Sequence, residues 1–110
     1  MGQKTDKKIV DIIRRFVESL RVDIPVDAVF LFGSYARGEA RSDSDIDLVV
    51  VSSAFNAGTN MANMQYLFRK AVKVSSLLEP IPATPAEVKR PGSRHFLKQV
   101  LPTARMFTFA

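Results

Sequence analysis

The spacing of apolar and polar residues predicts a chain that alternates between helices and strands. Apolar residues recur at helical spacing between charged residues from 6 to 21, which predicts an amphipathic helix capped by Thr5. Residues 28–32 and 45–51 are short apolar runs of the length and composition expected of strands. Helical spacing returns over residues 60–73, so a second long helix is expected there.

The last third of the sequence predicts shorter elements. Residues 75–79 predict a third strand, which we expect to stop at Pro80 and Pro82. Thr84-Pro-Ala-Glu87 has the form of a capping box with proline at the first helical position, so a short helix should start there. Residues 95–101 predict a final helix before an apolar tail at 106–109. With no repeat or linker, the 110 residues are expected to form one α+β domain, residues 1–110.

The turn after the first predicted strand carries the first chemical signal. Gly33 lets the backbone turn sharply and approach a phosphate without a Cβ in the way. Ser34 offers a hydroxyl and a backbone N–H, and it can cap a short helical turn that Gly38 closes. The segment therefore predicts a site for phosphate groups.

The second predicted strand carries a pair of aspartates. Asp45 and Asp47 are two residues apart, so both carboxylates should emerge on one face of the strand and converge on a divalent cation. Oxygen ligands suit Mg²⁺, which combines one or two carboxylates with substrate phosphates and water. A lone Gly-Ser is usually only a turn, and a lone Asp-x-Asp is more often solvated, but their combination with Gly38 and Ser44 is specific.

Composition narrows the class of protein. Hydrophobic residues make up 46 % and charged residues 25 %, as in an ordinary globular protein. The absence of cysteine excludes disulfides, thiolate zinc sites and thiol nucleophiles, and it fits a cytoplasmic location. The polar start of the chain and its short apolar runs predict neither export nor membrane attachment. A net charge of +5 favours anionic partners, but the basic residues are too scattered to indicate an RNA-binding groove.

The pattern G-S-x-x-x-G, five further residues and S-D-x-D, between two apolar strands, resembles the nucleotidyltransferase superfamily of DNA polymerase beta and kanamycin nucleotidyltransferase. The small size and the form Gly-Ser-Tyr-Ala-Arg-Gly resemble its minimal nucleotidyltransferases. Those proteins are prokaryotic and are often encoded beside a helical HEPN-type protein as toxin–antitoxin pairs. The resemblance implies the nucleotidyltransferase fold, with a small mixed β-sheet of three or more strands flanked by helices.

The resemblance also implies a reaction and a site. An acceptor hydroxyl would attack the α-phosphate of a nucleoside triphosphate, expected to be ATP, between two Mg²⁺ ions. Asp45 and Asp47 would hold the metals, and Glu79, at the end of the third predicted strand, would be the third carboxylate and could take the acceptor's proton. Asp43 is a rival that we expect in the preceding loop. The nucleotide-binding residues would be Gly33, Ser34, Arg37 and Ser44, although an exposed arginine such as Arg37 is as often only solvated.

The sequence does not identify the acceptor of the transferred group. The resemblance implies transfer of AMP to a HEPN-type protein partner, and the chain length agrees, because about thirty residues after the third strand are few for a small-molecule pocket. The alternatives are an antitoxin module that binds its partner with weak catalysis, and a transferase acting on a small molecule. The apolar tail favours contact with a partner, and a chain this short also leaves a homo-oligomer open.

Overall fold

A four-stranded sheet in the order β3-β2-β1-β4 organises the computed structural model, which describes residues 7–41, 43–56, 61–92 and 94–109. Its strands are β1 (Ala28–Phe32), β2 (Ile46–Val51), β3 (Leu78–Ala83) and β4 (Arg105–Phe107). Strand β1 is antiparallel to both β2 and β4, whereas β2 and β3 are parallel, which confirms the predicted mixed sheet. The helices are α1 (Lys7–Arg21), α2 (Ser34–Arg37), α3 (Met61–Val72), α4 (Pro85–Lys89), α5 (His95–Val100) and the 3₁₀ turn η1 (Leu101–Thr103).

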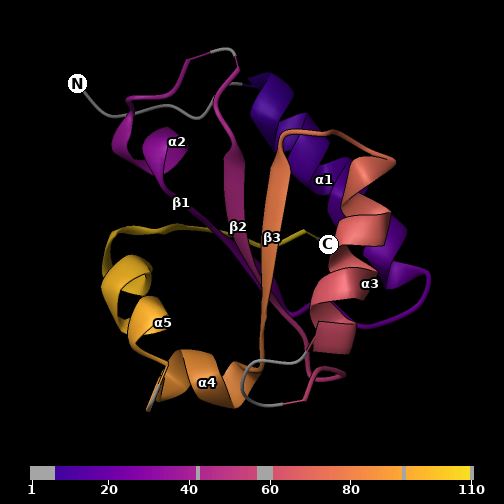
Figure 1. Cartoon of the computed structure of the whole chain (residues 1–110), viewed down its shortest axis with the longest axis vertical. Coiled ribbons are helices and arrows are strands. Elements are labelled where there is room, and N and C mark those ends of the chain that lie inside the picture. Colours follow the sequence, from indigo (N-terminus) through magenta and orange to yellow (C-terminus); the bar gives the residue numbers. More distant parts are fainter. Residues whose placement is uncertain (1–6, 42, 57–60, 93, 110) are drawn as a thin grey trace.

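The two faces of the sheet are covered by different helices. Helices α1 and α3 lie together on one side in Figure 1, and α4 and α5 lie away from them. The α1/α3 side holds the larger core, in which strand residues such as Leu31 and Leu48 pack with Phe16 and Leu67, all completely buried. A smaller cluster on the other face joins Val49, Val51 and Ala83 to Leu97 of α5. Because side chains alternate along a strand, Asp47 and Glu79 belong to the α5 face.

The predicted end of the third strand was wrong. Strand β3 continues through Pro80 and Pro82 to Ala83, because it lies at the edge of the sheet. The carbonyls of Leu77 and Ala83 accept hydrogen bonds from the β2 side, from the N–H groups of Ile46 and Ser52. Residues 80 and 82 alternate with these positions, so their nitrogens face the free edge, where a missing N–H breaks no ladder bond.

The predicted apolar tail is in part a fourth strand. Residues 105–107 form β4 and pair with β1 from Val29 to Leu31. The rings of Phe107 and Phe109 stack 6.3 Å apart against the main core, and the guanidinium of Arg14 lies 5.3 Å from the centre of the Phe109 ring. Met106 is the exposed apolar side chain of the tail, at 61 %. Most of the tail is therefore used inside the fold, which weakens the expectation that it contacts a partner.

The helix predictions agree with the structure to within a residue or two at most boundaries. The capping box is confirmed: the Thr84 hydroxyl accepts from the Glu87 N–H, and the Glu87 carboxylate accepts from the Thr84 N–H. The predicted N-cap of the short helix was wrong: Gly33 is the N-cap of α2, and Ser34 is its first residue. The proposed cap Thr5 lies outside the described residues. None of the described helices is long and apolar enough to cross a membrane.

Helix α5 is attached to the sheet by a buried ion pair. The Arg94 guanidinium lies 3.2 Å from the Glu87 carboxylate and also donates to the Pro82 carbonyl at 2.9 Å. Both side chains are largely shielded from water, with exposed fractions of 15 % and 10 %. These contacts join the end of β3, α4 and the start of α5, and so fix where α5 lies over its face of the sheet.

Candidate active site

The turn between β1 and α2 brings backbone against a carboxylate. Phe32 pairs with Asp47 across the antiparallel β1–β2 ladder, so the next residue, Gly33, turns directly beside the Asp47 side chain. Gly33 has φ 75° and ψ −151°, a conformation essentially restricted to glycine. A Cβ at this position would overlap Oδ2 of Asp47 and lie 3.2 Å from its Cγ. Only glycine therefore fits between the turn and the carboxylate.

Helix α2 is a single turn that follows Gly33. It spans Ser34–Arg37 and is closed by Gly38, as predicted, in a left-handed conformation with a φ of 74°. Four residues are too few for an appreciable helix dipole, so the groups that this turn offers to a phosphate are the Ser34 hydroxyl and the Arg37 guanidinium. The Tyr35 hydroxyl donates to the Arg41 carbonyl at 3.1 Å, so Tyr35 packs against the loop and its polar atom is engaged there.

The loop before β2 positions the first aspartate. The Arg41 N–H donates to the Ser44 hydroxyl at 2.7 Å, and the Ser44 N–H donates to the Arg41 carbonyl at 3.0 Å, so the loop forms a closed turn. Asp45, which was predicted to be the first residue of the strand, instead directly precedes β2, and its side chain is exposed. Asp43 lies in the loop, as expected, and is not among the residues that line the pocket.

Asp47 is the electrostatic centre of the site. Burial is the largest cause that raises its pKa above the usual 3.8, and the charges of Asp45 and Glu79 raise it further, while Arg37 lowers it. Glu79 pairs with Asp47 in the parallel β2–β3 register. The fold therefore brings Glu79, which is 32 residues later in the sequence, beside Asp47 on the same face of the sheet.

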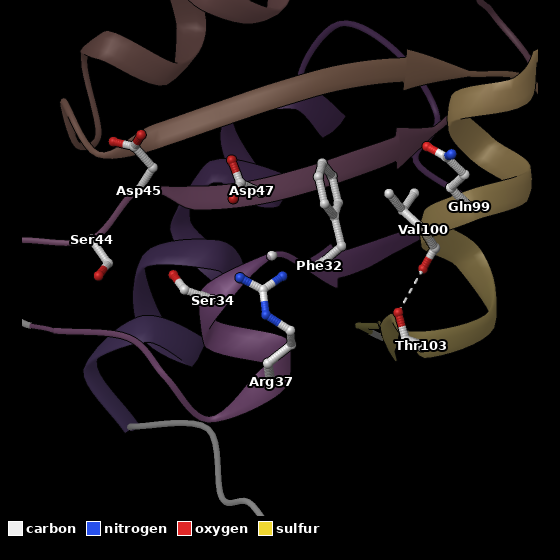
Figure 2. Close-up of a pocket in the computed structure, with 10 residues that line it drawn as sticks. Phe32, Ser34, Arg37, Ser44, Asp45, Asp47, Gln99, Val100 and Thr103 are labelled. Atoms are coloured by element: carbon white, nitrogen blue, oxygen red, sulfur yellow. Dashed lines mark hydrogen bonds between the residues drawn. The ribbon is translucent and has the colours of Figure 1, made fainter.

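A pocket of about 530 Å³ opens where β1 ends and β2 begins. Figure 2 shows Ser34, Ser44 and Asp45 toward one end of it, and α5 with Gln99 and Val100 toward the other. All the sequence-predicted site residues except Glu79 line this pocket: Gly33, Ser34, Arg37, Ser44, Asp45 and Asp47. The sequence missed four further lining residues, which are Phe32, Gln99, Val100 and Thr103.

The predicted magnesium ligands can be compared with this geometry. Within the described part of the chain, no three histidine or acidic side chains are arranged to hold a metal ion by themselves. The three-carboxylate set of Asp45, Asp47 and Glu79 therefore stays a prediction. Asp45 and Asp47 nevertheless offer two carboxylates in a pocket that also presents hydroxyls and a guanidinium, a donor set that suits Mg²⁺ together with a triphosphate.

The mixed sheet, the glycine turn and the paired aspartates define an α+β domain of the nucleotidyltransferase type. The sequence matches the nucleotidyltransferase domain family over residues 10–101, so the chain belongs to that family.

Two relatives and one solved structure show how far the similarity extends. The protein adenylyltransferase MntA of Thermococcus cleftensis is 40 % identical over 50 residues, which cover 46 % of this chain and 50 % of that protein. A Methanocaldococcus jannaschii protein named as a candidate protein adenylyltransferase is 31 % identical over 77 residues, covering 67 % of this chain and 78 % of the relative. The structure of a toxin–antitoxin complex with AMP-PNP superposes with a TM-score of 0.60 at 24 % identity, over 91 % of this chain and 73 % of the other, and supports the fold. The chain spans about half the length of most of the curated relatives it matches.

The close approach of Gly33 to Asp47 leads to a first prediction. Gly33→Ala should destabilise the fold by about 1–3 kcal/mol from backbone strain alone, with a further cost because the new methyl displaces the Asp47 carboxylate. Urea denaturation measures the loss. Gly92→Ala is the matched control, since Gly92 also has positive φ, 57°, but a Cβ there meets only the Arg90 carbonyl at 3.8 Å. Equal losses in the two variants would contradict the steric argument.

The raised pKa of Asp47 leads to a second prediction. The folded state binds the Asp47 proton more tightly than the unfolded chain, so folding loses stability as pH rises from the unfolded value of 3.8 through the raised pKa. In a chelating buffer, Asp47→Asn should therefore raise Tm at pH 7, and the gain should disappear below about pH 3.8.

Thermal melts between pH 3 and pH 7 test this. Asp43→Asn, at an exposed loop position outside the pocket, should leave Tm unchanged. If Asp47→Asn raises Tm equally at every pH, or does not raise it, the charge of the Asp47 carboxylate does not destabilise the folded state.

Proposed function

We propose that this domain transfers AMP from Mg-ATP to a hydroxyl group of a protein partner. The observation that carries the proposal is the pocket in which the Gly33–Ser34 turn meets Asp45 and Asp47. Phosphate-binding groups and metal-binding carboxylates line the same 530 Å³ cavity, a volume within the range of small-molecule sites. Membership of the nucleotidyltransferase family supports the reaction type.

Each residue around the turn has a separate task in binding the triphosphate. Gly33 keeps the backbone close to Asp47, and the Ser34 hydroxyl donates to a terminal phosphate oxygen. Arg37 reaches the same pocket and adds positive charge, although its Nε also donates to Glu39 at 2.7 Å. Ser44 shapes the opposite rim through its turn with Arg41.

Asp45 and Asp47 would hold Mg²⁺, expected as two ions, and Glu79 would complete the site from β3. When bound, the metal neutralises phosphate charge and lowers the cost of bringing a triphosphate beside two carboxylates. The acceptor oxygen forms a bond to the α-phosphorus, the bond from that phosphorus to the bridging oxygen breaks, and pyrophosphate leaves. Glu79, beside Asp47 in the β2–β3 register, takes the proton of the attacking hydroxyl.

A protein acceptor is supported by what is known of similar proteins. MntA of Thermococcus cleftensis is named a protein adenylyltransferase, and several similar structures are toxin–antitoxin complexes. We infer that the partner is a helical HEPN-type protein, and that it brings its own hydroxyl to the open rim of the pocket. ATP is the expected donor, in keeping with the AMP-PNP in one of those structures.

The third prediction tests the reaction itself. Incubation with Mg-ATP and the protein encoded beside this chain should add the mass of one or more AMP units to that partner, as read by mass spectrometry. Asp45→Asn with Asp47→Asn should abolish both the transfer and Mg-dependent binding of ATP, while circular dichroism stays unchanged because like charges are removed. Undiminished Mg-ATP affinity in the double variant, measured by calorimetry, would refute the metal site. If a small hydroxylated metabolite is modified instead of the partner, the acceptor is a small molecule and not a protein.

The fourth prediction separates Glu79 from the nucleotide-binding residues. Because Glu79 does not line the pocket but lies beside Asp47, Glu79→Gln should lower kcat by about 10²-fold or more and change Mg-ATP affinity by less than about threefold. Single-turnover transfer and calorimetry measure the two effects. Glu18→Gln, an exposed change on α1 away from the site, should alter neither. A loss confined to nucleotide affinity would place Glu79 among the binding residues.

A further inference from the structure

Helix α3 carries an apolar stripe that the fold leaves uncovered. Met61, Phe68 and Val72 are exposed at 67 %, 40 % and 66 %. Because they are seven and four residues apart, they form one row along the helix, about 17 Å long at 1.5 Å per residue. Single exposed apolar side chains are ordinary, but a continuous exposed row is typical of a surface that contacts another protein.

The stripe lies on the side of α3 that faces away from α1. On the α1 side, Tyr66 and Lys70 bind Asp23, which follows α1. Leu67 and Ala71 come next around the helix and are buried in the main core. The stripe follows in the same direction, opposite α1. Since α3 packs on β3, which is the edge strand of the sheet, the stripe lies beside the free edge of β3 (Figure 1).

The free edge of β3 does not suit a partner strand. Pro80 and Pro82 place their nitrogens on this edge and have no N–H to donate. The Pro82 carbonyl already accepts from Arg94 at 2.9 Å. A partner on this side of the molecule therefore has to bind through side chains. A helix laid along α3 does so, because the side-chain ridges of two helices interdigitate at residues three and four apart.

Basic side chains run beside the stripe. Arg69 and Lys73 are exposed and four residues apart, so they form a row next to that of Phe68 and Val72. Helix α3 itself contains no acidic residue. A second copy of this chain, packed α3 against α3, would bring like charges together with no carboxylate from either helix to balance them. An acidic partner is complementary to the same surface.

We propose that the α3 stripe is the docking surface for the protein acceptor, and that it binds an amphipathic helix whose apolar side is flanked by acidic residues. The inference rests on the proposed function, which brings the acceptor hydroxyl to Glu79. Glu79 lies on β3, the strand beside the stripe, so a partner held on α3 reaches it across the free edge of that strand. Docking and nucleotide binding then use separate surfaces, because no residue of α3 lines the pocket that holds the aspartates.

The test measures binding of the protein encoded beside this chain, by calorimetry without nucleotide. Phe68→Ser should weaken binding by about tenfold or more, since an aromatic side chain buried at an interface is a common hot spot. Val72→Ser should weaken it by about threefold or more. Val22→Ser is the matched control, because Val22 is 81 % exposed in the turn after α1, on the other side of α3, and its affinity should equal that of the wild type.

Charge reversal tests the acidic character of the partner. Arg69→Glu with Lys73→Glu should weaken binding by about tenfold or more at low salt, and by less at high salt, where the charges are screened. Lys7→Glu with Arg15→Glu changes the net charge equally at two exposed positions of α1, and it should leave the affinity within about twofold of the wild type. Equal effects of the two charge reversals would contradict an acidic helix on α3.

A transfer assay separates this inference from the proposed function. Phe68→Ser should raise the KM for the partner while kcat and Mg-ATP affinity stay near the wild-type values. Unchanged partner affinity in both Phe68→Ser and the α3 charge reversal would overturn the docking surface and leave the transfer reaction standing. Binding that depends on the stripe but leads to no AMP transfer would overturn the reaction and keep the contact.

Other occupants of the stripe give different results. A dimer of this chain alone that Phe68→Ser dissociates, as seen by sedimentation, would make a second copy the occupant and overturn the acidic helix. Binding to anionic lipid vesicles that Phe68→Ser abolishes, with unchanged affinity for the protein, would overturn it as well. If the wild-type chain does not bind the protein encoded beside it, both the docking surface and the protein acceptor are wrong.

Discussion

The contact between the Gly33 backbone and the Asp47 carboxylate is the constraint on which the site depends. The antiparallel register of β1 and β2 places Phe32 opposite Asp47, so the chain must turn beside that carboxylate as soon as β1 ends. A residue with a Cβ would overlap Asp47 and could not adopt φ 75° and ψ −151° without strain. The turn therefore positions Ser34 and Arg37 on the same pocket as the aspartates.

The same register concentrates negative charge. Asp45 and Glu79 both raise the pKa of Asp47, and partial burial raises it most. Folding thus keeps carboxylates together at a free-energy cost in the absence of a cation, which is the usual condition of sites that bind a metal with substrate phosphates. The glycine turn and the charge cluster are two consequences of one strand pairing. They explain how so short a chain brings the Gly33 turn and the aspartates together in one pocket.

Helix α5 completes the pocket from a different direction. Its position depends on the Thr84–Glu87 capping box and on Arg94, which joins Glu87 to the Pro82 carbonyl. Glu87 therefore serves both the start of α4 and the attachment of α5. Pro80 and Pro82, which were expected to end β3, instead present no N–H donor at its free edge, while the other side of the strand pairs with β2. Strand β3 can then carry Glu79 beside Asp47.

Most of the local structure could be predicted from the sequence, because the type of a helix or strand and the residue where it begins depend mainly on neighbouring residues. Helical spacing gave α1 and α3, the Thr84-Pro-Ala-Glu87 segment gave the start of α4, and Gly33, Ser34, Asp45 and Asp47 indicated one site. The extent of β3 could not be read in this way, since proline is tolerated only where a strand lies at the edge of a sheet. Strand order is a property of the whole fold.

What the sequence by itself determined is the chemistry of the motif and the type of most elements. The tertiary structure decided which distant residues join that motif. Residues 105–107 became β4 because the exposed edge of β1 was free to pair, and Phe107 and Phe109 then reached the main core. Glu79 came beside Asp47 through a parallel register set by the crossover helix α3. Gln99 and Val100 entered the pocket because long-range packing holds α5 over the sheet, and no pattern of neighbouring residues encodes a contact of that kind.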